Sequence, residues 1–202
     1  MSDRRSFEMR SFAELLPMVE ERIGTRNGSH RFHHTMGVVA TAEQLAIAHG
    51  VDVEKAKIAA LLHDVSKHDA FDAQRKLIAQ HYGESFARSW PNQLLHGFTA
   101  AIYAKETCGI DDPDILAAIE NHSVGRPGMS LLEKIVFAAD FLEPGRGKDP
   151  AGIRELALVQ LDRAIAKIIR FSLDHVRKMG YEIAPLSLET QAFYDPYLED
   201  AE

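Results

Sequence analysis

The sequence predicts an all-α fold for three reasons. Apolar residues recur at helical spacing through most of the 202 residues. No stretch alternates apolar and polar residues convincingly, as a half-buried strand would. Residues that favour helix ends stand where several of these apolar patterns begin and stop. With 46% apolar residues, the chain is long enough to bury roughly 70% of its unfolded surface on folding.

The helices expected in the first half follow from apolar spacing and capping residues. The N-terminal one is weakly amphipathic, whereas the second carries two neighbouring apolar stripes and is expected to be buried on more than one side. Asp52 and Asn92 can each cap a helix, and Gly109 can end the second of these. The expected helices are therefore 12–23, 31–49, 52–67 and 92–108.

The second half contains clearer signals for where helices begin and end. Asp112 before Pro113 is typical of an N-cap with proline at the first helical position. Ser130 and Glu133 predict a capping box, and Gly180 suits the C-terminal end of the last helix. The expected helices are 112–122, 130–143 and two within 150–180, the second at about 164–179. A Gly/Arg/Pro loop at 123–129 separates the first two, and the residues after 185 are expected to be loop-like.

Composition excludes several classes of function. The net charge of −7 and the lack of a basic block argue against a general nucleic-acid binder, because phosphate affinity needs clustered Lys and Arg. The longest apolar run is five residues, far below the about 18 that predict a membrane span. The single cysteine, Cys108, rules out a disulfide framework and is interpreted as a small core residue. Since no secretory signal is seen at the start either, we expect a cytoplasmic protein without a membrane partner.

Two aspartates stand inside apolar helical segments, which is where the sequence points to chemistry. Asp64 follows His63 in the segment IAALLHDV, and Asp140 lies in IVFAADFL. A buried carboxylate without a partner costs several kcal/mol, and a divalent metal would compensate for it. Three more histidines occupy comparable settings. The four imidazoles and two carboxylates are too many for one tetrahedral zinc and suit two adjacent metals with one bridging carboxylate. They are His34, His63, Asp64, His96, His122 and Asp140.

Structural interpretations of the same residues stay open at this point. A lone histidine on an apolar face is more often a core residue than a ligand, and a buried aspartate can pair with an arginine instead. The remaining histidines are interpreted as surface residues, with His33 the one most easily confused with its neighbour His34. Arg126 is either an exposed loop arginine or an anion clamp, and Glu143 is more often a surface acid than a residue that orients a ligand.

Other catalytic chemistries lack their residues. The sequence contains no HExxH pair, no Walker loop, no GxGxxG and no GxSxG elbow. Lys67 is three residues after Asp64 and four after His63, so helical spacing places it on the same side. A cation there would repel a metal, but it would suit a phosphate bound to that metal.

The ordered set of histidines and aspartates resembles the HD superfamily of metal-dependent phosphohydrolases. Five local strings resemble its YqeK-type branch, the bacterial symmetrical diadenosine tetraphosphate hydrolases. The resemblance is firm from 31 to about 146 and looser to about 180. The strings are RFHHT (31–35), LLHDVSK (61–67), HGFTAA (96–101), HSVGRPGM (122–129) and ADFLEP (139–144).

The resemblance implies a helical HD-domain bundle with a two-metal centre, most often iron, that cleaves diadenosine tetraphosphate into two ADP. Manganese or cobalt is also compatible with these ligands. The implied ligands are His34, His63, Asp64 and Asp140 for one metal, and Asp64, His96 and His122 for the other. Asp64 and Lys67 take the catalytic roles, through bridging and through charge compensation during attack by a metal-activated water. The implied phosphate-binding residues are Arg31, Lys67, Arg126 and Arg146.

The expected organisation has three parts: a helical N-terminal extension at 1–27, the HD phosphohydrolase domain at 28–180, and a tail at 181–202 that packs on the domain or extends from it. The expected partner is a small nucleotide substrate, and a homodimer is left open. Two alternatives remain: another HD phosphohydrolase activity on nucleoside di- or triphosphates or mononucleotides, and a nucleotide-binding regulator without turnover.

Overall fold

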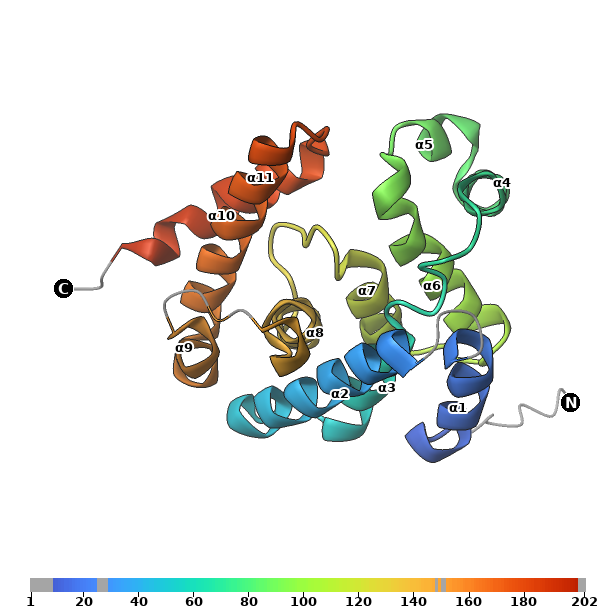
Figure 1. The fold of residues 1–202 in the computed structure, drawn as a ribbon, viewed down its shortest axis with the longest axis horizontal. Helices are drawn as coiled ribbons and strands as arrows, with labels where there is room; N and C mark the ends of the chain where they lie inside the picture. Colours follow the sequence, from blue (N-terminus) through green and yellow to red (C-terminus); the bar gives the residue numbers. More distant parts are fainter. Residues whose placement is uncertain (1–8, 25–28, 148, 150–151, 200–202) are drawn as a thin grey trace, which may run out of the picture.

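The computed structural model describes residues 9–24, 29–147, 149 and 152–199, which form helices joined by turns and short loops (Figure 1). These ranges contain no strand, so the predicted all-α fold is confirmed. No helix within them is both long and apolar enough to cross a membrane. The helices are α1 (Phe12–Val19), α2 (Ser29–His49), α3 (Val53–Leu62), α4 (Phe71–Tyr82), α5 (Glu84–Arg88), α6 (Leu95–Glu106), α7 (Pro113–Asn121), α8 (Leu131–Leu142), α9 (Ile153–Val159), α10 (Leu161–Met179) and α11 (Pro185–Tyr194). Short turns of other helix types are η1 (Glu20–Gly24), η2 (Asn92–Leu94), η3 (Pro144–Arg146) and η5 (Asp195–Leu198).

The core lies where the central helices meet. Helix α2 packs against α3 and α8, and α7 packs between α6 and α8. Figure 1 shows α7 and α8 in the middle, with α4–α6 on one side and α9–α11 on the other. The fully buried side chains Leu61, Ile119 and Ile135 belong to one continuous apolar cluster. The central helices are therefore fixed by burial on several sides.

Capping residues act as predicted in three places. The Asp52 side chain accepts a hydrogen bond from the backbone N–H of Lys55 at the start of α3. Asp112 does the same for α7, and Ser130 forms the expected capping box at the start of α8. These caps satisfy backbone donors that a helix N-terminus leaves unpaired.

Helix α3 ends five residues earlier than the predicted 52–67 helix. The chain leaves it at Leu62, and tighter i→i−3 bonds follow: Val65 N donates to Leu62 O and Lys67 N to Asp64 O, at 3.2 and 3.0 Å. The expected helix at 92–108 also begins later, because Asn92 lies in a 3₁₀ turn and its side chain accepts a hydrogen bond from Arg75. The predicted end of the first helix and the predicted start of the second are both wrong because short turns lie there, and apolar periodicity does not distinguish such turns from α-helix.

Two regions are more helical than predicted. The expected set has no helix at 71–88, where α4 and α5 pack through a separate aromatic cluster that includes Phe86 and Phe98. The loop-like expectation after 185 is wrong, because α11 begins with Pro185 at its first turn and fully buries Thr190 and Tyr194. The apolar pattern of α11 is short and interrupted by polar residues, so its helical character depends on packing against α10.

The predicted helix near the N-terminus is confirmed as α1, followed by η1. Leu15 and Val19 are fully buried in the main core, where α1 packs on α3. Residues 1–8 and the expected domain boundary at 27 fall outside the described residues.

Candidate metal centre

Five segments bring four histidines and two aspartates together. His34 comes from α2, the pair His63 and Asp64 from the turn after α3, His96 from the start of α6, His122 from the end of α7, and Asp140 from α8. In each of three overlapping triplets, the nitrogen or carboxylate oxygen atoms lie within 4.8 Å of one another. The triplets are His34–His63–Asp64, His63–His122–Asp140 and Asp64–His96–His122. We call these six residues the His–Asp centre.

The close approach of α6 and α7 depends on a glycine. A Cβ at Gly97 would lie 2.5 Å from the backbone oxygen of Glu120, so only glycine lets the two helices approach this closely. This packing places the Nε2 atoms of His96 and His122 3.1 Å apart. The interior of the centre is therefore set by backbone packing.

Hydrogen bonds orient the histidine rings. The Nδ1–H groups of His63, His96 and His122 donate to backbone oxygens three residues earlier, at 2.6, 2.9 and 2.7 Å. His34 Nδ1 donates to a carboxylate oxygen of Glu143 at 3.0 Å. Each ring thereby turns its Nε2 toward the centre, which is how metal-binding histidines are commonly fixed.

Asp64 lies at the middle of the centre. Its Oδ1 is 3.2 Å from His96 Nε2 and 3.5 Å from His122 Nε2, and its Oδ2 is 3.7 Å from His63 Nε2. Asp140 completes the other side, with its Oδ1 3.1 Å from His34 Nε2 and 3.7 Å from His63 Nε2. Asp64, His63 and His122 each belong to two of the three triplets, and of these only Asp64 offers two ligand oxygens with which to bridge two cations.

Several buried atoms in the centre lack a hydrogen-bond partner. They are the Nε2 atoms of His34 and His63 and the Oδ1 atom of Asp64. Buried polar atoms are nearly always paired in folded proteins, because leaving one unpaired costs about 1–3 kcal/mol. Three such atoms in one place, a carboxylate oxygen and two imidazole nitrogens, fit a bound cation.

The protonation states suit cation binding. Burial lowers the pKa values of His63 and His96 to about 4, so both rings are neutral at neutral pH. Burial acts against ionisation of Asp64, but the neighbouring His63, His122, His96 and Lys67 hold its pKa well below the usual value. The pKa of Asp140 is likewise lowered, because His34, His63 and Arg146 outweigh burial. The centre thus offers two ionised carboxylates and, at His63 and His96, neutral imidazoles.

His34 differs from the other histidines. Burial acts to lower its pKa, but the Asp140 and Glu143 carboxylates outweigh burial and raise the pKa above its ordinary value. At any pH below this raised pKa, a cation binding at Nε2 must therefore displace a proton from the ring.

The interpretation of Glu143 as a surface acid is wrong. The residue is only 3% exposed, and its carboxylate accepts hydrogen bonds from His34 Nδ1 and from the backbone N–H of Gly145. A Cβ at Gly37 would lie 2.5 Å from Glu143 Oε2, so α2 makes room for this carboxylate with a glycine. Glu143 is part of the ADFLEP string that carries the family resemblance. That its side chain reaches His34 is visible only in the structure.

Three of the four predicted phosphate-binding residues border the centre. Arg31 donates to Asp64 Oδ2 at 2.7 Å, and Arg146 donates to Asp140 Oδ1 at 2.5 Å. Lys67 donates to His96 Nε2 at 2.8 Å and lies 3.5 Å from Asp64 Oδ1. Each of these cations is partly exposed and can face a polyanion from the rim.

Arg126 has a different partner. Its guanidinium donates to both carboxylate oxygens of Glu133, at 2.6 and 2.7 Å, and Glu133 is only 1% exposed. Asn121 and the backbone N–H of Ser130 bind the same carboxylate. The observed contacts of Arg126 are therefore those of a residue that holds the 123–129 loop onto α8.

The sequence did not single out Ser123. Its hydroxyl oxygen lies 3.0 Å from His122 Nε2 and 3.1 Å from His96 Nε2. A serine in a polar loop carries no distinguishing signal, and only its position beside His122 could have suggested it.

Several minor predictions can be compared directly. Cys108 is fully buried and His33 is exposed, both as predicted. The expectation that His49 lies on the surface is wrong, because the residue is partly buried and its Nε2 donates to the backbone oxygen of Ala157 at 2.7 Å.

Comparison with known proteins places this geometry in a family. Residues 31–145 match the family model described as HD domain. The chain is 38% identical over 162 residues to a protein of Halalkalibacterium halodurans named "Bis(5'-nucleosyl)-tetraphosphatase, symmetrical", covering 80% of this chain and 87% of that relative. It is 36% identical to the Bacillus subtilis protein of the same name, covering 77% and 84%.

A solved structure supports the same relationship. The crystal structure of a predicted HD superfamily hydrolase involved in NAD metabolism from Clostridium acetobutylicum aligns with a TM-score of 0.81. The two proteins are 32% identical, and the alignment covers 94% of this chain and 99% of that one. The helical fold, the match over 31–145 and these relatives together show that the chain belongs to the HD-domain family.

Proposed function

We propose that this protein hydrolyses dinucleoside tetraphosphates symmetrically, so that diadenosine tetraphosphate yields two ADP. The observation that carries the proposal is the His–Asp centre, with six metal-type ligands in overlapping triplets. Relatives that match most of the chain bear the name of this activity, which supports the choice of substrate. The proposal therefore combines a site suited to phosphoryl chemistry with a substrate class taken from relatives.

Two divalent cations fit the residues of the centre. His34, His63, Asp64 and Asp140 would hold one, and Asp64, His96 and His122 the other, with Asp64 shared. Bound there, the cations would supply an acidified water as nucleophile and stabilise charge on the attacked phosphate. We propose iron as the native metal, with manganese and cobalt as alternatives, since nitrogen and oxygen ligands accept all three.

The protein's own residues prepare the centre for a polyphosphate. Asp64 and Asp140 stay ionised beneath the rim, while Lys67, Arg31 and Arg146 stand above them as partly exposed cations. A phosphate chain entering here would draw these cations away from the carboxylates, and would accept their hydrogen bonds instead. No general acid is required, because the terminal phosphate of a departing ADP is a weak base. A phosphate contact for Arg126 stays a prediction and requires it to leave Glu133.

We further propose a cytoplasmic location. The one cysteine is buried and unpaired, and the proposed substrate is a nucleotide. Disulfide-free proteins are typical of reducing compartments.

Product analysis tests the proposed function. Protein loaded with a defined metal is incubated with diadenosine tetraphosphate, and the nucleotides are separated by chromatography. The proposal predicts ADP as the sole nucleotide product, and it predicts that a chelator abolishes turnover and metal restores it. ATP together with AMP would indicate asymmetric cleavage. No turnover in fully metal-loaded protein would indicate a nucleotide-binding regulator.

A further inference from the structure

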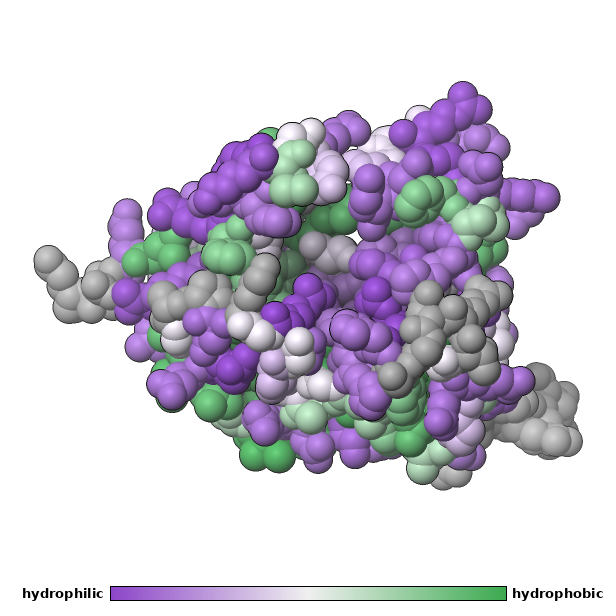
Figure 2. All heavy atoms as spheres, viewed as in Figure 1, coloured by the Kyte–Doolittle hydropathy of each residue, from purple (hydrophilic) through white to green (hydrophobic). Residues whose placement is uncertain are grey.

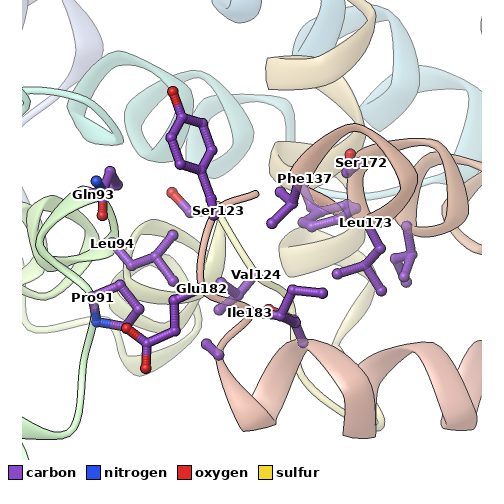
Figure 3. Close-up of a pocket in the computed structure, with 15 residues that line it drawn as sticks. Pro91, Gln93, Leu94, Ser123, Val124, Phe137, Ser172, Leu173, Glu182 and Ile183 are labelled. Carbon is purple, nitrogen blue, oxygen red and sulfur yellow. The ribbon is translucent and has the colours of Figure 1, made fainter. Parts of the chain in front are cut away.

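An open cavity of about 660 Å³ lies beside the His–Asp centre (Figure 3). Pro91 and Leu94 border it on one side, and Leu173 and Ile183 on the other. The loop after α7 lies between these sides. Figure 2 shows a hollow in this face of the molecule, between α4–α6 and α9–α11. The cavity lining is mostly apolar with a few polar side chains, as in small-molecule sites.

Ser123 connects the cavity to the centre. The residue lines the cavity, and its hydroxyl oxygen lies within 3.1 Å of the Nε2 atoms of His96 and His122. A ligand can therefore occupy the cavity while its neighbouring atoms reach the centre.

The chemistry of the proposed substrate requires a site in this position. This step rests on the proposed function. Symmetrical cleavage breaks the bond between the second and third phosphates, so one phosphate separates the attacked phosphorus from the nearer ribose. A nucleoside must then lie next to the centre but outside it, and its base needs apolar cover.

We propose that this cavity binds one nucleoside of the substrate, with the base between the apolar walls and the ribose toward Ser123. Polar side chains at the border, including Gln93, Ser172 and Glu182, are placed to meet the edge of the base or the ribose hydroxyls.

The inference gives the C-terminal helices a role in specificity. Cavity residues from 169 to 187 belong to α10, α11 and the segment between them, all beyond the 31–145 that match the HD-domain model. The matched domain supplies the His–Asp centre, whereas the helices outside it supply one wall of the nucleoside site. Substrate choice is then set by a part of the chain separate from the metal ligands.

The test fills the cavity and compares two ligands. Ser172→Phe places a ring in the cavity from α10, and Lys178→Phe places the same ring on an exposed position of that helix as a matched control. Calorimetry measures the binding of ADP and of methyl diphosphate, which carries the two phosphates without a nucleoside, to manganese-loaded protein. We expect ADP to bind S172F about tenfold more weakly, a loss of about 1.4 kcal/mol, because the ring fills space that the nucleoside would occupy. Methyl diphosphate should bind it as it binds the wild type, and K178F should bind both ligands normally.

Two results would overturn the inference: unchanged ADP affinity in S172F, or an equal loss for both ligands, which would place the damage at the centre. Should S172F melt at a much lower temperature than the wild type, Tyr181→Ala provides the same comparison at a cavity residue that is 56% exposed. We expect it to weaken ADP binding several-fold and to spare methyl diphosphate, and unchanged ADP affinity would again overturn the inference. The wild type's products are measured separately, so failure of the nucleoside site with ADP-only turnover leaves the proposed function intact.

Discussion

Two groups of buried charge in this protein differ in how completely their atoms are paired. The Glu133 carboxylate accepts hydrogen bonds from Arg126, Asn121 and Ser130, so both of its oxygens are satisfied. In the His–Asp centre, by contrast, Asp64 Oδ1 and the Nε2 atoms of two histidines have no hydrogen-bond partner.

This difference separates a structural pair from a binding site. A buried charge whose partners all come from the fold contributes to conformation and leaves no place for a ligand. A cluster whose acceptor atoms are left unpaired is stable only with something bound, or at a cost in free energy. The sequence suggests function for both groups, because Arg126 stands in a Gly/Pro loop beside His122 and the two aspartates stand in apolar helical segments. Only the pairing of their atoms in the structure tells the two groups apart.

The largest expected effect follows from removing the shared ligand. Asp64→Asn keeps the shape of the side chain but removes its charge, so both cations lose affinity. We expect kcat/KM for diadenosine tetraphosphate to fall about 10³-fold, which corresponds to a loss of roughly 4 kcal/mol of transition-state stabilisation. Steady-state kinetics and metal analysis check this, with exposed Asp72→Asn as the control. Full metal content and normal rates in D64N would show that Asp64 is not a bridging ligand.

A smaller effect is expected from the residue that orients His34. Glu143→Gln weakens the hydrogen bond to His34 Nδ1, and Gly37→Ala forces the same carboxylate to move. Changes of this kind cost about 10–100-fold in metal affinity or activity. Manganese titration of both variants measures it, with exposed Glu106→Gln as the control. Wild-type affinity in both would leave Glu143 as a purely structural acid.

Acidification should weaken metal binding first through His34. Its raised pKa means that, below that value, a proton occupies the ring and must leave when a cation binds. Metal affinity should therefore fall by about tenfold per pH unit below this pKa and be independent of His34 above it. His63 and His96 add to the loss only near pH 4, where their own pKa values lie. Manganese affinity measured from pH 5 to 8 provides the test, and a constant affinity across that range would contradict it.

The smallest effect on activity is expected at the pair formed by Arg126 and Glu133, in which both carboxylate oxygens are hydrogen-bonded within the fold. Arg126→Ala removes two hydrogen bonds from a buried carboxylate. We expect the free energy of unfolding to fall by about 1–3 kcal/mol, while kcat/KM changes little. Urea unfolding and steady-state kinetics measure the two quantities together. A large rise in KM with unchanged stability would instead support the phosphate contact predicted from the sequence.

Sequence reasoning was most successful where a residue's chemistry conflicts with its surroundings. Asp64 and Asp140 in apolar segments predicted a shared site, and the structure brings them together with the four selected histidines. The caps at Asp112 and Ser130 were also predictable, since capping depends on residues a few positions apart.

It was least successful where an outcome depends on distant partners. Tertiary packing rather than local pattern decides where α3 ends and why residues 185–194 form a helix. It also decides that the Glu143 side chain points to His34. Glu143 is the clearest case, because an acid at the end of a helix is usually solvated. Here a glycine more than 100 residues earlier leaves room for it to reach His34.

The most direct test of the His–Asp centre is anomalous scattering from crystals grown with manganese. The account predicts two peaks among the six side chains, one reached by His34, His63 and Asp140, the other by His96 and His122, with Asp64 between them. Manganese bound elsewhere on the surface, with these six side chains unliganded, would contradict it.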